Sequence, residues 1–120
     1  VMGRRHAGLA VFAPQALAAY EEALQRPGSA TSLCEDYRAS AGVDLVHDRE
    51  DRVAGRRLTQ PLRVLWGRHG TVGRCFDVLG LWRDVAQQVD GRALDCGHYL
   101  AEERPDEVLQ DALSFFKETP

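Results

Sequence analysis

The first half of the chain carries apolar residues at helical spacing, which predicts three helices. The first begins at Pro14, a residue that suits the first turn of a helix, and it stops at the Arg-Pro-Gly step at 26–28. A second begins near Ser29 and breaks at Gly42, and the charged segment 44–54 continues as a third. We expect no strand in the first 55 residues.

From Pro61 onward the pattern changes to that of a sheet covered by helices. The run 62–66 reads Leu-Arg-Val-Leu-Trp and ends at Gly67. A short, nearly continuous apolar run of this kind is typical of a strand buried on both faces of a parallel sheet. After a glycine-bearing loop, one helical stripe is predicted from Val78, Trp82, Val85 and Val89.

A second strand and a final helix complete the predicted pattern. The strand covers residues 91–96, and the helix opens at Pro105 with two acidic residues in its first turn. We expect its inward side to consist of Leu109, Ala112, Leu113 and Phe116. The order strand, helix, strand, helix predicts an α/β fold with two parallel strands joined by a right-handed crossover.

Two parallel strands with flanking helices are too few for a stable sheet. Such a pair leaves its outer edges unpaired, and the apolar run 62–66 predicts that a further strand pairs with it. We therefore expect the chain to be the C-terminal part of a larger α/β protein, or to pair with another chain.

Composition and charge exclude several classes of protein. The chain has 120 residues, 44% of them hydrophobic, and a net charge of -3, so it should fold as a soluble protein. No apolar stretch reaches the roughly 20 residues of a membrane span. Acidic residues offset the arginines, which argues against nucleic-acid binding. The cysteines Cys34, Cys75 and Cys96 are isolated, so we expect reduced, mostly buried thiols, no metal site and a cytoplasmic location.

His98 is the first candidate for chemistry. It follows the second predicted strand, directly after Gly97, and precedes the last helix. In α/β sheets the loops beyond the carboxyl ends of the strands carry the active site, so a histidine there can act as a base. A plain surface or capping histidine is the alternative for this residue taken alone.

The residues around His98 resemble the end of α/β-hydrolase-fold enzymes. Segment 97–108 reads Gly-His-Tyr-Leu-Ala-Glu-Glu-Arg-Pro-Asp-Glu-Val, followed by Leu113 and a Phe-Phe pair. In that fold the catalytic histidine stands in a Gly-His step, an acidic residue and a proline follow, and an apolar helix closes the chain. The run Pro-Leu-Arg-Val-Leu-Trp-Gly at 61–67 is similar to the penultimate strand of the fold.

A second segment narrows the resemblance to haloacetate dehalogenases, including their fluoroacetate-active members. It reads Cys-Glu-Asp-Tyr-Arg-Ala at 34–39, and the resemblance covers essentially the whole chain. Further matching positions are Asp44, His47, Asp48, Trp82 and Arg83. The resemblance implies that residues 1–42 are part of a helical cap and that residues 43–120 are the C-terminal part of the α/β-hydrolase core.

In that family an Asp attacks the carbon that bears the halogen, and a water activated by the histidine then hydrolyses the resulting ester. His98 matches this base. Tyr37 matches the cap tyrosine whose hydroxyl helps to hold the halide, with a packed cap aromatic as the alternative. The implied substrate is a short haloacid, no cofactor is required, and a homodimer is left open.

The sequence departs from the family because it lacks the nucleophile. No Gly-x-Asp-x-Gly elbow occurs in the chain. The nucleophile, the arginines that bind the substrate carboxylate and the acid that orients the histidine would all precede Val1. We therefore expect the 120-residue chain to be inactive without its missing N-terminal half or another chain.

Three alternatives stay open to different degrees. Epoxide hydrolases share the Asp nucleophile and the histidine base, and they use cap tyrosines to protonate the opening oxygen, so Tyr37 alone does not separate them from dehalogenases. A noncatalytic fragment is the second alternative. Nucleotide binding is the weakest, because the spacing of Gly67, Gly70 and Gly73 fits neither a dinucleotide fingerprint nor a P-loop.

Overall fold

The computed structural model describes residues 8–118, and these form two compact units. The helical unit comprises Ala13–Arg57. The sheet unit comprises the chain from Leu58 onward, together with the segment that ends at Phe12. The assignment of residues 1–42 to a cap and 43–120 to a core stays a prediction, since the contacts within one chain define units and not the domains of a larger protein.

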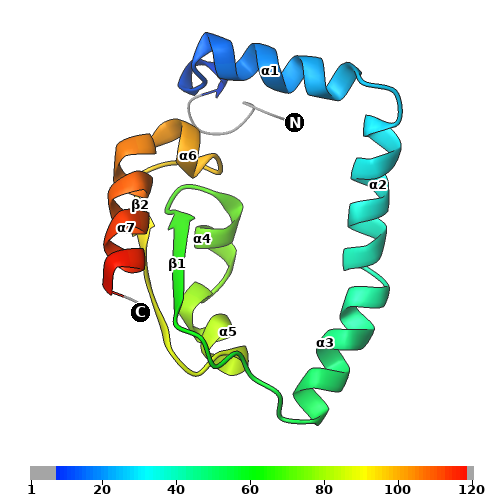
Figure 1. Ribbon diagram of the computed structural model, residues 1–120, viewed down its shortest axis with the longest axis vertical. Helices are drawn as coiled ribbons and strands as arrows, with labels where there is room; N and C mark the ends of the chain where they lie inside the picture. The colour runs from blue at the N-terminus through cyan, green and yellow to red at the C-terminus, as the bar shows by residue number, and fades with distance from the viewer. Residues whose placement is uncertain (1–7, 119–120) are drawn as a thin grey trace. The chain divides into compact units, whose positions relative to one another are not determined.

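The helical unit contains the three predicted helices, α1 (Pro14–Gln25), α2 (Ser29–Ser40) and α3 (Val43–Val53), labelled in Figure 1. Gly28 separates α1 from α2 with a φ of 87°, in the left-handed region that glycine enters without steric cost. None of the residues in these helices is buried. Among the helices of residues 8–118, none is long and apolar enough to cross a membrane.

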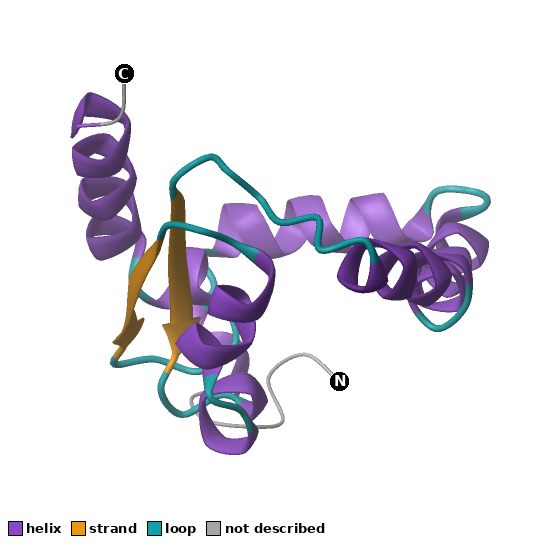
Figure 2. Ribbon diagram, turned by 90° about the horizontal axis from the view of Figure 1, so that it is seen from below, coloured by secondary structure: helices purple, strands orange, loops and turns teal. Residues whose placement is uncertain are grey.

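The sheet unit is built on two parallel strands, β1 (Leu62–Gly67) and β2 (Val89–Leu94), which lie side by side in Figure 2. The register pairs Leu62 with Val89 and Gly67 with Leu94. Helices α4 (Thr71–Cys75) and α5 (Val78–Val85) connect the strands. The predicted strand, helix, strand, helix order is confirmed, and within the described residues each strand has one edge without a neighbouring strand.

Helices cover the two faces of this sheet differently. Arg63 on β1 and Arg92 on β2 both reach Asp111 of α7 (Pro105–Glu118), so their face lies toward α7. Side chains alternate along a strand, and Trp66 on the opposite face packs near Gly73 of α4. The sheet is therefore enclosed between α7 on one side and the connecting helices on the other.

The helical stripe predicted from Val78 to Val89 is wrong at Val89, because Val89 is the first residue of β2. Helix α5 ends at Val85 because the following backbone joins an isolated parallel bridge between Leu58 and Ala86. The Leu58 N–H donates to the carbonyl of Val85, and the Gln87 N–H donates to the carbonyl of Leu58. This pairing turns the chain from helix to extended structure, so β2 begins earlier than its predicted start.

The predicted inward side of α7 is also wrong for its largest members. Leu109 is 54% exposed and Phe116 is 75% exposed, whereas Asp111 is buried. The Asp111 carboxylate accepts hydrogen bonds from Arg63 at 2.9 Å and from Arg92 at 3.0 Å. Because leaving a buried carboxylate without these partners would be costly, the ion-pair network orients the helix in place of its apolar stripe.

Candidate functional site

His98 lies where the sequence predicts it, in the loop that follows the carboxyl end of β2. Its side chain is exposed, the preceding Gly97 is buried and the following Tyr99 is half-buried. The short helix α6 (Leu100–Glu103) begins immediately afterward. Ligands of open α/β sheets bind at this end of the strands, so the position is suited to a catalytic group.

A single carboxylate holds the backbone on both sides of His98. Glu103 Oε2 accepts a hydrogen bond from the Gly97 N–H at 2.7 Å, and Oε1 accepts one from the Tyr99 N–H at 3.1 Å. The backbone N–H of Glu103 in turn donates to the Tyr99 carbonyl at 2.9 Å. This reciprocity, like that of a capping box, fixes the loop to the first turn of α6.

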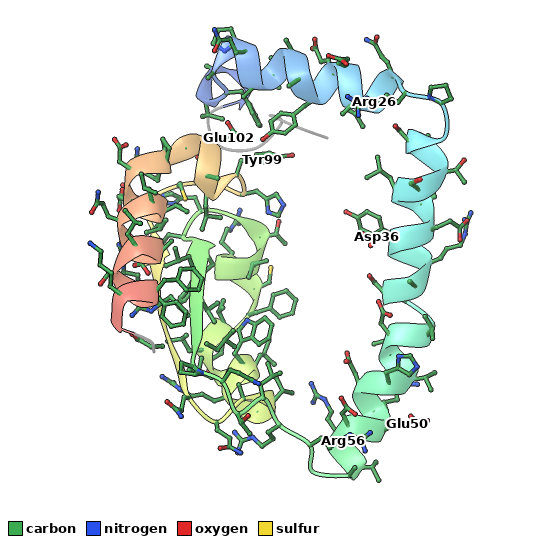
Figure 3. The ribbon with its side chains drawn as sticks, in the orientation of Figure 1. Arg26, Asp36, Glu50, Arg56, Tyr99 and Glu102 are labelled. Atoms are coloured by element: carbon green, nitrogen blue, oxygen red, sulfur yellow. The ribbon has the colours of Figure 1, made fainter. Side chains whose placement is uncertain are left out.

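Aromatic contacts continue from the His98 loop to the start of the described chain. The Tyr99 ring lies edge-on to the His98 ring, with centroids 5.1 Å apart, and edge-on to Phe12 at 5.0 Å. Figure 3 labels Tyr99 and Glu102 at the beginning of α6. Phe12 is buried, so the tyrosine ring packs against a fixed partner beside the histidine.

The turn after β1 packs tightly on the same loop. A Cβ added at Gly67 would stand 1.5 Å from the carbonyl oxygen of Gly97, which places the two backbones in direct contact. The N–H of Arg68 donates to the Leu94 carbonyl at 2.9 Å, and the N–H of His69 donates to the Cys96 carbonyl at 3.0 Å. Ladder-like bonds therefore join both post-strand loops beyond the ends of the strands.

A hydrogen bond between His69 and Asp95, which the sequence pattern did not predict, also links these two loops. His69 Nε2 lies 2.7 Å from Asp95 Oδ1, although the residues are 26 positions apart. The hydrogen bond to His69, and then its charge, hold the pKa of the Asp95 carboxyl below its usual range, and Arg68 and Arg104 contribute less. The pair is exposed to solvent and lies on the edge of the His98 loop.

Cys96, the cysteine nearest to His98 in the sequence, is buried. Cys96 is 1% exposed, and burial, followed by the negative charge of Glu103, raises the pKa of its thiol. A thiol held in its neutral form is a poor nucleophile. Cys96 is therefore a buried cysteine, whereas Cys34 and Cys75 are exposed, so the expectation of mostly buried thiols is wrong for these two.

Tyr37 lies in the helical unit, on α2. Its side chain is 76% exposed, and Asp36 beside it is labelled in Figure 3. An ion pair between Arg38 and Glu35 flanks it on the same helix. The surroundings of Tyr37 are thus those of an open helix surface, and its role at a halide, like the role of His98 as a base, stays a prediction.

Two surface hollows of the described residues lie away from His98. One of about 430 Å³ runs along α3 and is lined by Arg49, Glu50, Val53, Ala54 and Arg56. Another of about 400 Å³ lies at the amino ends of β1 and β2, the opposite end of the strands from His98. Within residues 8–118, no group of three or more His, Cys, Asp and Glu side chains could hold a metal ion.

The chain is similar in sequence and structure to several known proteins. No protein-family model matches the sequence. A soluble epoxide hydrolase from a Corynebacterium species is 35% identical over 108 residues, covering 88% of this chain and 35% of its own length. The structure of a candidate α/β hydrolase from Nostoc is 43% identical over 91% of this chain and 37% of its own, with a TM-score of 0.84. The chain belongs to the α/β-hydrolase superfamily.

Other solved structures also match. A candidate epoxide hydrolase from Pseudomonas aeruginosa is 41% identical over 90% of this chain and 36% of its own length, with a TM-score of 0.80. A candidate acyltransferase from Salmonella enterica has the same fold at 38% identity and a TM-score of 0.84. The chain therefore spans about a third of the length of these relatives, consistent with the predicted C-terminal part of an α/β-hydrolase fold.

Proposed function

We propose that this chain is the C-terminal part of an α/β-fold hydrolase in which His98 is the general base. The observation that carries the proposal is the position of His98, exposed at the carboxyl end of β2 in a loop that Glu103 holds at both flanking N–H groups. A base must stand within hydrogen-bonding reach of the water that it activates, and a fixed loop maintains that distance.

The proposed reaction has two steps and uses an Asp nucleophile outside this chain. In the first, an Asp carboxylate oxygen bonds to a substrate carbon, whose leaving group departs with the bonding electrons. In the second, water adds to the carbonyl carbon of the ester and transfers its proton to His98. The alcohol then leaves, takes up a proton, and the Asp carboxylate is restored.

Two substrate classes fit this chemistry. The related proteins described as epoxide hydrolases support an epoxide, whose ring oxygen would leave carbon but remain in the product diol. The Cys-Glu-Asp-Tyr-Arg segment around Tyr37, similar to haloacetate dehalogenases, supports a short haloacid, whose halide would be released. We place the epoxide first because the sequence and structural relatives favour it, and the haloacid second.

The sequence that precedes Val1 tests the proposal first. A coding frame that continues upstream and contains a Gly-x-Asp-x-Gly elbow would supply the nucleophile and the remaining strands. A stop codon directly upstream would defeat the single-chain enzyme and leave only assembly with a second chain. For the complete protein, diol formation from epoxides measured against halide release from haloacetates decides between the two substrates. A protein that forms neither diol nor halide would refute the proposal.

Tyr37→Phe in the complete protein should slow the first step by about three- to tenfold, the value of one lost hydrogen bond. The hydroxyl would donate to the leaving halide or to the opening epoxide oxygen. The side chain is 76% exposed on α2, so we expect the free energy of unfolding to change by less than about 0.5 kcal/mol. Rapid-mixing measurement of ester formation and urea unfolding check the two expectations.

Tyr20→Phe provides the matched control for Tyr37→Phe. Tyr20 lies on α1 of the helical unit, so this variant removes one tyrosine hydroxyl from a neighbouring helix and should leave the rate of ester formation unchanged. An unchanged first step in Tyr37→Phe, or an equal loss in both variants, would remove the role proposed for the Tyr37 hydroxyl.

A further inference from the structure

Glu103 is unusual in the sheet unit because both of its carboxylate oxygens bind backbone N–H groups of one short loop. Gly97 donates to Oε2 at 2.7 Å and Tyr99 donates to Oε1 at 3.1 Å. The two donors are the residues on either side of His98. The carboxylate thus restrains the peptide units before and after the histidine without touching its ring in these hydrogen bonds.

We infer that Glu103 is a positioning residue for His98 in the ester-hydrolysis step. The inference rests on the proposed function, since it assigns a base to that step. Three further contacts involve the same two residues that flank His98: the Gly97 carbonyl packs on Gly67, the Tyr99 ring packs on Phe12, and the Tyr99 carbonyl accepts from the backbone N–H of Glu103. Glu103 joins these contacts into one rigid frame around the histidine.

Charge-assisted hydrogen bonds make this frame stronger than neutral ones would. A carboxylate binds N–H donors about twice as strongly as a neutral acceptor does, and Gly97 is buried, where an unsatisfied N–H would be costly. Glutamine at this position offers one acceptor oxygen and one NH₂ donor. One of the two loop N–H groups would then face a donor, and the loop around His98 would lose one of its two hydrogen bonds to the side chain of residue 103.

The test separates the two steps of the reaction in the complete protein. In Glu103→Gln we expect hydrolysis of the ester to slow by about tenfold or more, because a small misplacement of the base is costly, while ester formation stays within about twofold. The ester should therefore accumulate and be visible by intact-protein mass spectrometry during turnover. Glu103→Asp keeps the charge and both oxygens but is one methylene shorter, so hydrolysis should slow by a smaller factor, about threefold, with ester formation unchanged.

Asp106→Asn is the matched control, since it removes one carboxylate charge from the exposed first turn of α7 and should leave both steps unchanged. If Glu103→Gln fails to fold, Glu103→Asp carries the test with the same two rate constants. Wild-type hydrolysis in Glu103→Gln, an equal loss in both steps, or an equal effect of Asp106→Asn would overturn the inference. Failure of the wild-type protein to form diol or halide would instead overturn the proposed function.

Discussion

His98→Gln in the complete protein is expected to complete one turnover of the first step and then stall as the covalent ester. Glutamine cannot accept the proton of the attacking water, so steady-state turnover should fall by about a thousandfold, within the usual range for loss of a general base. Ester formation does not require the base and should proceed. An adduct in the intact-protein mass spectrum would measure both effects with either substrate, and a haloacid would also give a burst of halide stoichiometric with the protein.

His69→Gln is the control for this substitution. His69 lies on the neighbouring post-strand loop, pairs with Asp95 at 2.7 Å, and shares the residue type and the degree of exposure, but it does not belong to the proposed machinery. Its variant should turn over within a few-fold of wild type. Normal turnover of His98→Gln with no trapped adduct would remove the role assigned to His98, whichever substrate is used.

Much of the fold was predictable because local sequence decides it. The apolar run 62–66 is flanked by Pro61 and Gly67, and a run of this length with such ends has few outcomes other than a strand, although residues 62–66 are half-buried in this chain and not buried on both faces as predicted. The helix breaks are equally local: Gly28 adopts a positive φ that other residues resist. Each of these features depends on residues within a few positions of one another.

The orientation of α7 was not predictable from its own sequence. Leu109, Leu113 and Phe116 form the more apolar stripe, yet the helix turns Asp111 toward the sheet. The deciding groups are Arg63 and Arg92, which reach α7 only because the strand register places both on the same face. A helical periodicity holds no information about charged partners on another element.

In the candidate site, too, the local features were predictable and the long-range contact was not. His98 was identified because a Gly-His step after a strand is a local pattern, and the Glu103 contacts lie within six residues of it. The pairing of His69 with Asp95 spans 26 residues and follows from the alignment of Gly67 with Leu94 across the sheet. The register of parallel strands is set by packing and not by a turn, so no short sequence motif predicts it.

Gly67→Ala is expected to destabilise the protein more than alanine at any other described glycine of the sheet unit. Its Cβ would stand 1.5 Å from the Gly97 carbonyl oxygen and 2.9 Å from that of Cys96, and both obstacles are backbone. No rotamer change relieves such an overlap, so the end of β1 and the His98 loop must separate. We expect a loss of about 3 kcal/mol in the free energy of unfolding, measured by urea denaturation of the complete protein.

Gly70→Ala tests whether this loss arises from the contact or from any added methyl in the turn. Its Cβ would meet the same Gly97 oxygen at 3.3 Å, which a shift of a few tenths of an ångström relieves, so its cost should stay below about 1 kcal/mol. Equal unfolding midpoints for the two variants would contradict the close packing of Gly67 on Gly97. Because Gly97 adjoins His98, Gly67→Ala should also slow ester hydrolysis more than ester formation, since separating the loops displaces the base while the nucleophile lies elsewhere.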